Sequence, residues 1–196
     1  MLFRIGIAAL LTVAGVRGQV SAGGGIGLSV LSRDSKASPS GPLATQYDAG
    51  KGALAHAFAG WRVHEYIGVQ GAYVWTRNAA VLRTVGAGAF QEQRLNVSQN
   101  QVGGDFLLFF RDSKSWIQPF LSVGLGITSF SGAGDGVRVS GAKPGMRVAA
   151  GVDVWTRGAW GFRYAFLETI GPNPILPGAD HALMTFKNQF GVIWRR

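Results

Sequence analysis

The residues of this sequence best suited to acid–base or metal chemistry are its three histidines, because imidazole titrates near neutral pH and binds metal ions. They are His56, His64 and His181. Their spacing matches no metal-ligand pattern, and none has a serine two positions later. The chain has no cysteine, so it also lacks a thiolate nucleophile and a disulfide. The sequence therefore predicts a protein that is not an enzyme, with no catalytic, metal or cofactor-binding residue.

Five charged residues form a second set, because each lies on the small, polar side of a segment whose other side is apolar. They are Asp105, Arg147, Asp153, Arg163 and Lys187. Two interpretations are open: the charges satisfy one another as ion pairs in an enclosed interior, or they line a gated ion path. We expect ion pairs, because a buried charge without a partner is strongly destabilising.

The length fits a single domain, and the composition is unusually apolar. Of 196 residues, 47% are hydrophobic and only 15% are charged, whereas soluble proteins carry about 25% charged residues. The 30 glycines are about twice the usual share. Such a hydrophobic chain does not fit intrinsic disorder.

The first 22 residues have the features of a secretory signal peptide. Arg4 precedes an uncharged apolar run over 5–16, and Val20-Ser21-Ala22 fits the small-residue pattern before a cleavage site. We therefore predict a signal peptide over 1–22, export of the protein, and one domain over 23–196.

Strict alternation of apolar with small or polar residues dominates the rest of the chain. In "YIGVQGAYVWT" (66–76), Ile67, Val69, Tyr73 and Trp75 share one face. Segments of about ten such residues have the length of tilted membrane strands. Eight strands are predicted, over 23–33, 53–63, 66–76, 101–111, 116–128, 145–155, 160–168 and 184–195.

The connections between these strands alternate in length, which predicts the topology. Four long connections, over 34–52, 77–100, 129–144 and 169–183, take turns with short ones around "HEY", "DSKS" and "RGA". In an up-and-down barrel all long connections lie at one end and all short ones at the other. The predicted fold is all-β: an eight-stranded antiparallel up-and-down transmembrane β-barrel.

Residues that face each other across a hairpin point to the same side of the sheet, and this rule predicts two registers. A three-residue loop over 157–159 places Asp153 opposite Arg163, so that opposite charges meet. A four-residue loop over 112–115 places Asp105 opposite Ser122.

The residue types on the two faces predict which one meets water. Exposed strand positions in soluble sheets rarely hold glycine, because it packs nothing there and costs entropy. Here glycine and alanine dominate the polar faces, which fits a narrow enclosed interior with the apolar faces turned to lipid. Large aromatic residues near the strand ends then form an interfacial girdle. The predicted girdle residues are Trp61, Tyr73, Trp75, Trp160 and Trp194.

Together with the signal peptide and the eight strands, the ending "FKNQFGVIWRR" resembles the small outer-membrane β-barrel proteins typified by the OmpA membrane domain and OmpX. The resemblance covers about residues 23–196 and implies a monomer in the cell outer membrane of Gram-negative type. It also implies contact with outer-membrane lipid and lipopolysaccharide, and insertion by the barrel-assembly machinery.

The function expected from these features is a structural or surface-interaction role in the cell envelope, with four long extracellular loops that meet surface ligands and no catalysis. Basic residues scattered over the four loops do not form one nucleic-acid-binding face. They are Lys36, Lys51, Arg77, Arg83, Arg94, Arg138 and Lys143. The alternatives are a narrow porin-like channel, a lipid A-modifying enzyme, or an exported soluble ligand-binding barrel.

Overall fold

The computed structural model describes residues 18–31, 36–37, 44–86, 89–134, 137–172 and 182–196, and most of these residues lie in β-strands. Eight of the strands in these ranges are long, and β2 has two residues. Their bounds are β1 Gln19–Leu31, β2 Lys36–Ala37, β3 Ala44–His64, β4 Ile67–Gly86, β5 Ala89–Phe109, β6 Ile117–Gly134, β7 Val137–Trp155, β8 Trp160–Gly171 and β9 Leu183–Arg195. No helix in the described ranges is long and apolar enough to cross a membrane.

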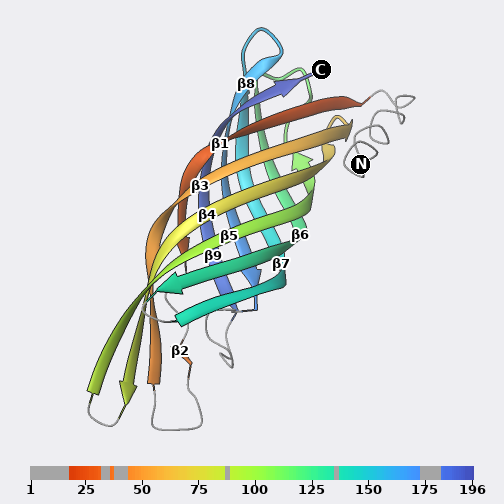
Figure 1. Cartoon of the computed structure of the whole chain (residues 1–196). Coiled ribbons are helices and arrows are strands. Elements are labelled where there is room, and N and C mark those ends of the chain that lie inside the picture. The colour runs from red at the N-terminus through yellow and green to blue at the C-terminus, as the bar shows by residue number, and fades with distance from the viewer. Residues whose placement is uncertain (1–17, 32–35, 38–43, 87–88, 135–136, 173–181) are drawn as a thin grey trace, which may run out of the picture.

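The eight long strands close into a barrel, as Figure 1 shows. Their order around the wall is β1, β9, β8, β7, β6, β5, β4 and β3, and pairing of β1 with β3 closes the ring. Every neighbouring pair is antiparallel. Strands adjacent in the chain are adjacent in the wall, so the predicted eight-stranded up-and-down barrel is confirmed.

The barrel is apolar outside and mostly polar inside. On β6 buried and exposed residues alternate, and the exposed ones include Leu121, Val123 and Leu125. On β8, Phe162 and Tyr164 are exposed whereas Arg163 is buried between them. The sheet therefore has the inverted arrangement that its glycine-rich polar faces predict.

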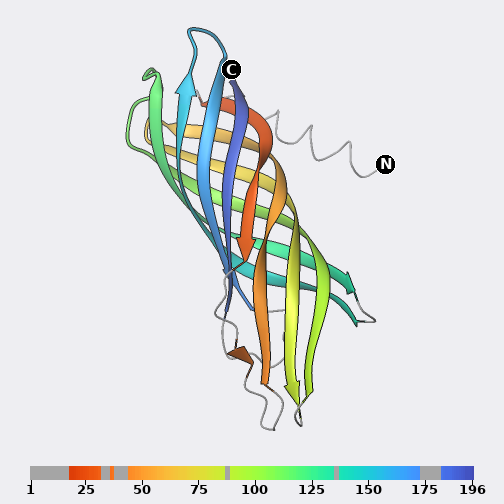
Figure 2. The same cartoon turned by 90° about the vertical axis from the view of Figure 1, so that its left-hand side faces the viewer.

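The described strands extend well beyond the predicted ones at the long-connection end. β3, β4 and β5 have 21, 20 and 21 residues and project from the barrel as a long sheet, visible in Figures 1 and 2. The segment 77–100, expected to be a loop, is instead a hairpin in which Gly86 pairs with Ala89. The expected loop 129–144 is likewise mostly a hairpin, ending at the pair Gly134 and Val137. Antiparallel pairing can continue past the barrel rim because each strand satisfies the backbone groups of the other.

The first strand begins earlier than predicted. β1 starts at Gln19, and Val20 pairs with Trp61 of β3. The amide of Val20 also donates to the carbonyl of Arg196 over 3.1 Å. Residues 19–22 thus lie in the wall, whereas residues 1–17, most of the predicted signal peptide, lie outside the described residues.

Of the two predicted registers, one is confirmed and one is wrong. Asp153 pairs with Arg163, and the amide of Thr156 donates to the carbonyl of Trp160 over 3.0 Å. Asp105, however, pairs with Gly124 rather than with Ser122. The connection between β5 and β6 is two residues longer than the predicted four-residue loop, because side-chain hydrogen bonds within the connection hold it in a wider turn.

Asp112 organises this β5–β6 connection. Its Oδ1 accepts hydrogen bonds from the Ser115 hydroxyl at 2.9 Å, the Ser115 amide at 2.8 Å and the Lys114 amide at 3.0 Å. These bonds, that of the Ser115 hydroxyl first, hold the pKa of Asp112 below its ordinary value. The side-chain amide of Gln118, through Nε2, then donates to the backbone carbonyls of Asp112, Ser113 and Ser115.

Replacing Ser115 by alanine should therefore raise the pKa of Asp112 toward the ordinary value of about 3.9. Because the folded-state pKa is depressed, the contribution of Asp112 to stability is present above about pH 4 and is lost as the pH falls through the folded-state pKa. Carboxyl-carbon NMR titration of the folded protein measures the shift. Ser113→Ala is the matched control, and an equal rise of the pKa in both variants would contradict the assignment.

Candidate functional site in the barrel interior

An ion pair between Asp105 of β5 and Arg147 of β7 spans β6 on the inner side of the barrel wall. Arg147 Nε lies 2.8 Å from Asp105 Oδ1, and Nη2 lies 3.0 Å from Oδ2, so the contact is bidentate. Gly124 of β6 lies between the two residues in register with both. A Cβ at Gly124 would collide with the Asp105 side chain, and one at Gly103 would lie 2.6 Å from Arg147 Cδ. Glycine is therefore required here for the pair to form.

A second ion pair, Asp153 with Arg163, lies closer to the short-turn end. Arg163 Nε and Nη2 each lie 2.6 Å from a carboxylate oxygen of Asp153. Arg163 also donates to Gln70 Oε1 across the interior. Its guanidinium lies between the rings of Phe58 and Phe120, 4.2 and 4.7 Å from their centroids. Ion pairing, a third hydrogen bond and cation–π contact thus compensate for burial of this charge.

Lys187 has a different environment from the other four charged residues. It is 1% exposed, and its Nζ lies 2.9 Å from Gln101 Oε1 and 3.2 Å from Thr169 Oγ1. Gln101 Nε2 in turn donates to Thr128 Oγ1 over 3.0 Å. The acceptors that the described interior offers to Lys187 are therefore neutral oxygens, whereas the sequence predicted ion pairs throughout. These partners come from β5 and β8, so the spacing along β9 gives no indication of them.

Aromatic residues close the short-turn end of the interior. Arg62 lies 4.0 Å from the Phe109 centroid and donates to Gln118 Oε1 over 2.7 Å. Arg195 lies 4.1 Å from the Trp155 ring and donates to the Ser113 carbonyl over 3.0 Å. The sequence analysis missed the role of these rings. Their positions could have indicated it, because Phe109 and Trp155 are in phase with the inward-facing Asp105 and Asp153 of the same strands. Other buried apolar side chains that it missed are Leu54, Leu107, Leu167 and Ile193.

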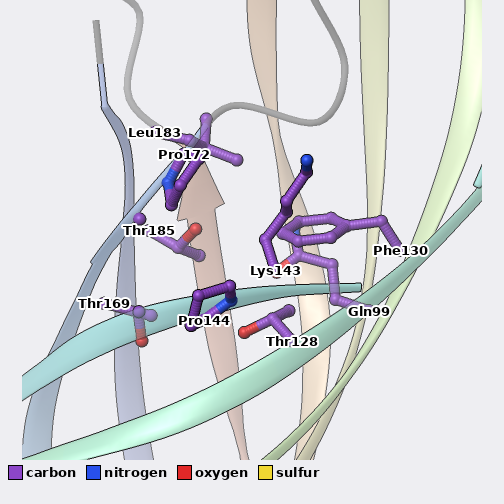
Figure 3. A pocket seen from close by; sticks show the side chains of 11 residues that line it. Gln99, Thr128, Phe130, Lys143, Pro144, Thr169, Pro172, Leu183 and Thr185 are labelled. Atoms are coloured by element: carbon purple, nitrogen blue, oxygen red, sulfur yellow. The ribbon is translucent and has the colours of Figure 1, made fainter. Parts of the chain in front are cut away.

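Two very small cavities lie in the described interior. One of about 20 Å³ adjoins both ion pairs, and one of about 10 Å³ lies at the long-connection end. Figure 3 shows the second, with Thr128, Thr169 and Thr185 around it and Lys143 extending away from these threonines. Each cavity has room for about one water molecule. Side chains therefore leave little free space beside the two ion pairs.

The two histidines that the structure describes, His56 and His64, lie eight positions apart on the same strand and are not brought together. His56 is buried in the wall, with Nε2 3.4 Å from the Phe190 carbonyl and its ring stacked on Phe58. His64 is exposed at the end of β3, and His181 lies outside the described residues. Among the described residues no group of three or more histidine, aspartate or glutamate side chains could hold a metal ion.

The residues predicted to form an aromatic girdle all point outward, in two groups. Trp160 and Trp194 pair with each other at the short-turn end, and Trp61 lies beside Val20 at the same end. Tyr73 and Trp75 lie farther along β4, and the Tyr73 hydroxyl donates to Asn100 Oδ1 over 2.6 Å. Tyr73 and Trp160 are exposed, and the other three are partly buried.

Comparison with solved structures identifies the fold. The chain is similar to Ail, the attachment invasion locus protein of Yersinia pestis, with a TM-score of 0.59 and 14% identity over 91% of this chain and 99% of that one. It is similar to Neisserial surface protein A (TM-score 0.57, 16% identity, 90% and 96% covered). It is also similar to the outer membrane protein OprG from Pseudomonas aeruginosa (TM-score 0.60, 13% identity, 91% and 96% covered). No protein-family model and no curated sequence matches the chain.

Replacing Asp105 by alanine should destabilise the barrel by about 3–5 kcal/mol, because it leaves Arg147 buried without its carboxylate. The double variant Asp105→Leu/Arg147→Met should recover much of this loss, since it removes both charges at similar volume. Urea unfolding of the folded protein, followed by tryptophan fluorescence, measures both effects. As a control, Glu65→Ala in the exposed β3–β4 turn should change stability by less than about 0.5 kcal/mol. Equal effects of Asp105→Ala and Glu65→Ala on the free energy of unfolding would show that the Asp105–Arg147 ion pair does not stabilise the barrel.

Proposed function

We propose that this chain is an outer-membrane barrel that holds a projecting β-sheet outside the cell, in a structural or surface-interaction role without catalysis. The observation that carries the proposal is the inverted and closed barrel: apolar residues cover the outer wall, while ion pairs and aromatic rings fill the interior. Such a wall suits hydrocarbon, and such an interior suits an anchor more than a pore.

The asymmetry between the two ends supports the proposed orientation. The short-turn end is compact, and both ends of the described chain lie there (Figure 1). The other end carries the extensions of β3, β4 and β5. Outer-membrane barrels have short periplasmic turns and longer extracellular connections. We accordingly assign the projecting sheet to the cell exterior.

Exposed basic residues on the extracellular side suggest the chemistry of a partner. Lys51, Arg77 and Lys143 are exposed on β3, β4 and β7, beyond or near the barrel rim. They would favour acidic groups such as lipopolysaccharide phosphates or anionic cell surfaces. One of the similar solved structures is Ail in complex with the heparin analogue sucrose octasulfate, which is a ligand of that protein.

Insertion of a specific protease site tests the location and the orientation together. Placed in the β4–β5 connection at residues 87–88, the site should be cut in intact cells expressing the full chain. The matched control places the same site in the β7–β8 turn at Gly158, where cutting should require permeabilised cells. The reverse pattern would overturn the orientation. Recovery of the protein in the soluble fraction would overturn the membrane location, and steady single-channel current in planar bilayers would favour a channel.

An arginine on the outer wall gives a second test. Val123→Arg, in the middle of β6, should destabilise the protein in phospholipid vesicles by about 2–4 kcal/mol, because the charge must enter hydrocarbon. Val123 is 52% exposed, so in a soluble barrel the same change would be nearly neutral. Ser113→Arg in the β5–β6 turn is the control. Urea unfolding in vesicles measures both, and equal stabilities of the two variants would contradict a lipid-facing wall.

A further inference from the structure

A groove lies on the outer wall of the barrel where β7, β8, β9 and β1 run side by side. Its volume is about 440 Å³, which is within the range of small-molecule binding sites. Two rows of residues in register across the four strands form it. From β7 to β1, one row is Val152, Tyr164, Phe190 and Ile26, and the other is Val154, Phe162, Val192 and Gly24.

Glycines hollow out the groove. Gly24 faces outward beside Val192 and has no side chain to fill the space there. The side chains of Ile26 and Phe162, which are 73% and 62% exposed, project from the wall on neighbouring strands. Behind it, Gly25 of β1 pairs with Gly191 of β9. A Cβ at Gly25 would collide with the Phe190 carbonyl, so this part of the wall cannot be thickened by a side chain.

The lining of the groove suits a hydrocarbon chain. All the side chains of the two rows are aliphatic or aromatic, and the one hydroxyl, that of Tyr164, donates to Asn188 Oδ1 over 2.9 Å. Tyr164 and Phe190 pack against each other with their ring centroids 4.9 Å apart. A polar ligand would find no free hydrogen-bonding side chain among these residues, whereas an acyl chain needs none.

Basic residues lie beyond the short-turn end of the groove. Val192 and Trp194 face outward on β9, and the exposed Arg196 follows the end of this strand, about 13 Å of extended chain beyond Val192. The amide of Arg196 donates to the Val20 carbonyl over 2.9 Å, which holds this residue in the wall. The exposed Arg157 lies in the β7–β8 turn, next to the end of β9, because the amide of Arg195 donates to the Ala159 carbonyl over 2.8 Å.

We propose that the groove binds an acyl chain of an anionic glycerophospholipid whose phosphate contacts Arg157 and Arg196. The order along the wall matches such a lipid: an apolar groove, then Trp160 and Trp194 at the level where indole rings favour the interface, then the two cations. The inference rests on the proposed membrane location, and it places the lipid in the leaflet at the short-turn end.

A second copy of the chain fits the groove less well than a lipid does. Two copies inserted in the same direction are related by an axis along the membrane normal, so identical ends meet. A contact through this groove would bring the arginines of one copy toward those of the other. Repulsion between like charges disfavours that contact, whereas a lipid phosphate would neutralise them.

Native mass spectrometry of the full chain, purified from expressing cells in a nonionic detergent, tests the proposal. With phosphatidylglycerol and phosphatidylcholine added at equal concentration, the wild type should retain one phosphatidylglycerol per barrel at least tenfold more often than phosphatidylcholine. Val192→Trp fills the groove from β9 and should reduce retention about tenfold. Val152→Trp fills it from β7 and should do the same, which guards against a local folding defect in either variant.

Matched controls separate the groove from general effects. Val123→Trp adds the same ring to the outer wall on β6, away from the groove, and should leave lipid retention unchanged. Arg157→Gln/Arg196→Gln should reduce phosphatidylglycerol to the level of phosphatidylcholine. Arg111→Gln/Lys114→Gln removes two charges from another turn at the same end and should preserve the preference.

Several results would overturn the proposal. These are the absence of retained lipid, equal losses in Val123→Trp and Val192→Trp, preference for lipid A over phosphatidylglycerol, and a dimer that Val192→Trp abolishes. A gel shift on boiling in SDS and recovery in the outer-membrane fraction report separately on the barrel and its location. A membrane-embedded barrel that retains no lipid would refute the groove alone, whereas a soluble protein would refute the proposed function as well.

Discussion

Closure of the hydrogen-bonded wall is the constraint on which the rest of this structure depends. In hydrocarbon an unpaired backbone amide or carbonyl costs several kcal/mol, so a sheet that spans a bilayer can have no open edge. Pairing of β1 with both β3 and β9 removes that edge. With only eight strands the ring is narrow, and side chains take up most of its interior. The frequent inward glycines follow from this narrowness, as at Gly124, where one methyl group would displace the Asp105 carboxylate.

The filled interior also braces the barrel across its width. Arg62 of β3 contacts Gln118 of β6, and Lys187 of β9 contacts Gln101 of β5. Each contact joins strands that are not neighbours in the wall. Such braces resist flattening of the ring, and they satisfy polar groups that neither water nor lipid can reach. The polar and charged side chains of this interior therefore have a structural role. That role explains why so many polar side chains are buried in a protein with few charged residues.

The sequence predicted the parts of this structure that depend on local periodicity. Alternation along each strand was enough for the eight strands, for the inverted faces and, through the short 157–159 loop, for the Asp153–Arg163 register. It failed where a distant or self-contained interaction decides the outcome. Side-chain hydrogen bonds of Asp112 lengthen the β5–β6 connection, and mutual pairing turns 77–100 from a loop into a hairpin. The neutral partners of Lys187 come from distant strands, so no spacing along one strand reveals them.

The pairing of Val20 with Arg196 joins residues from opposite ends of the described chain. This seam has the highest contact order in the wall, so its formation is expected to come late in folding and to limit the rate. The β1 strand is also rich in glycine, so few side chains pack around the β1–β9 pairing to stabilise it once it has formed. Amide hydrogens along β1 would then exchange before those of β3, β5, β6 and β9, which contacts across the interior hold together, so that local opening of the barrel would start at its first strand.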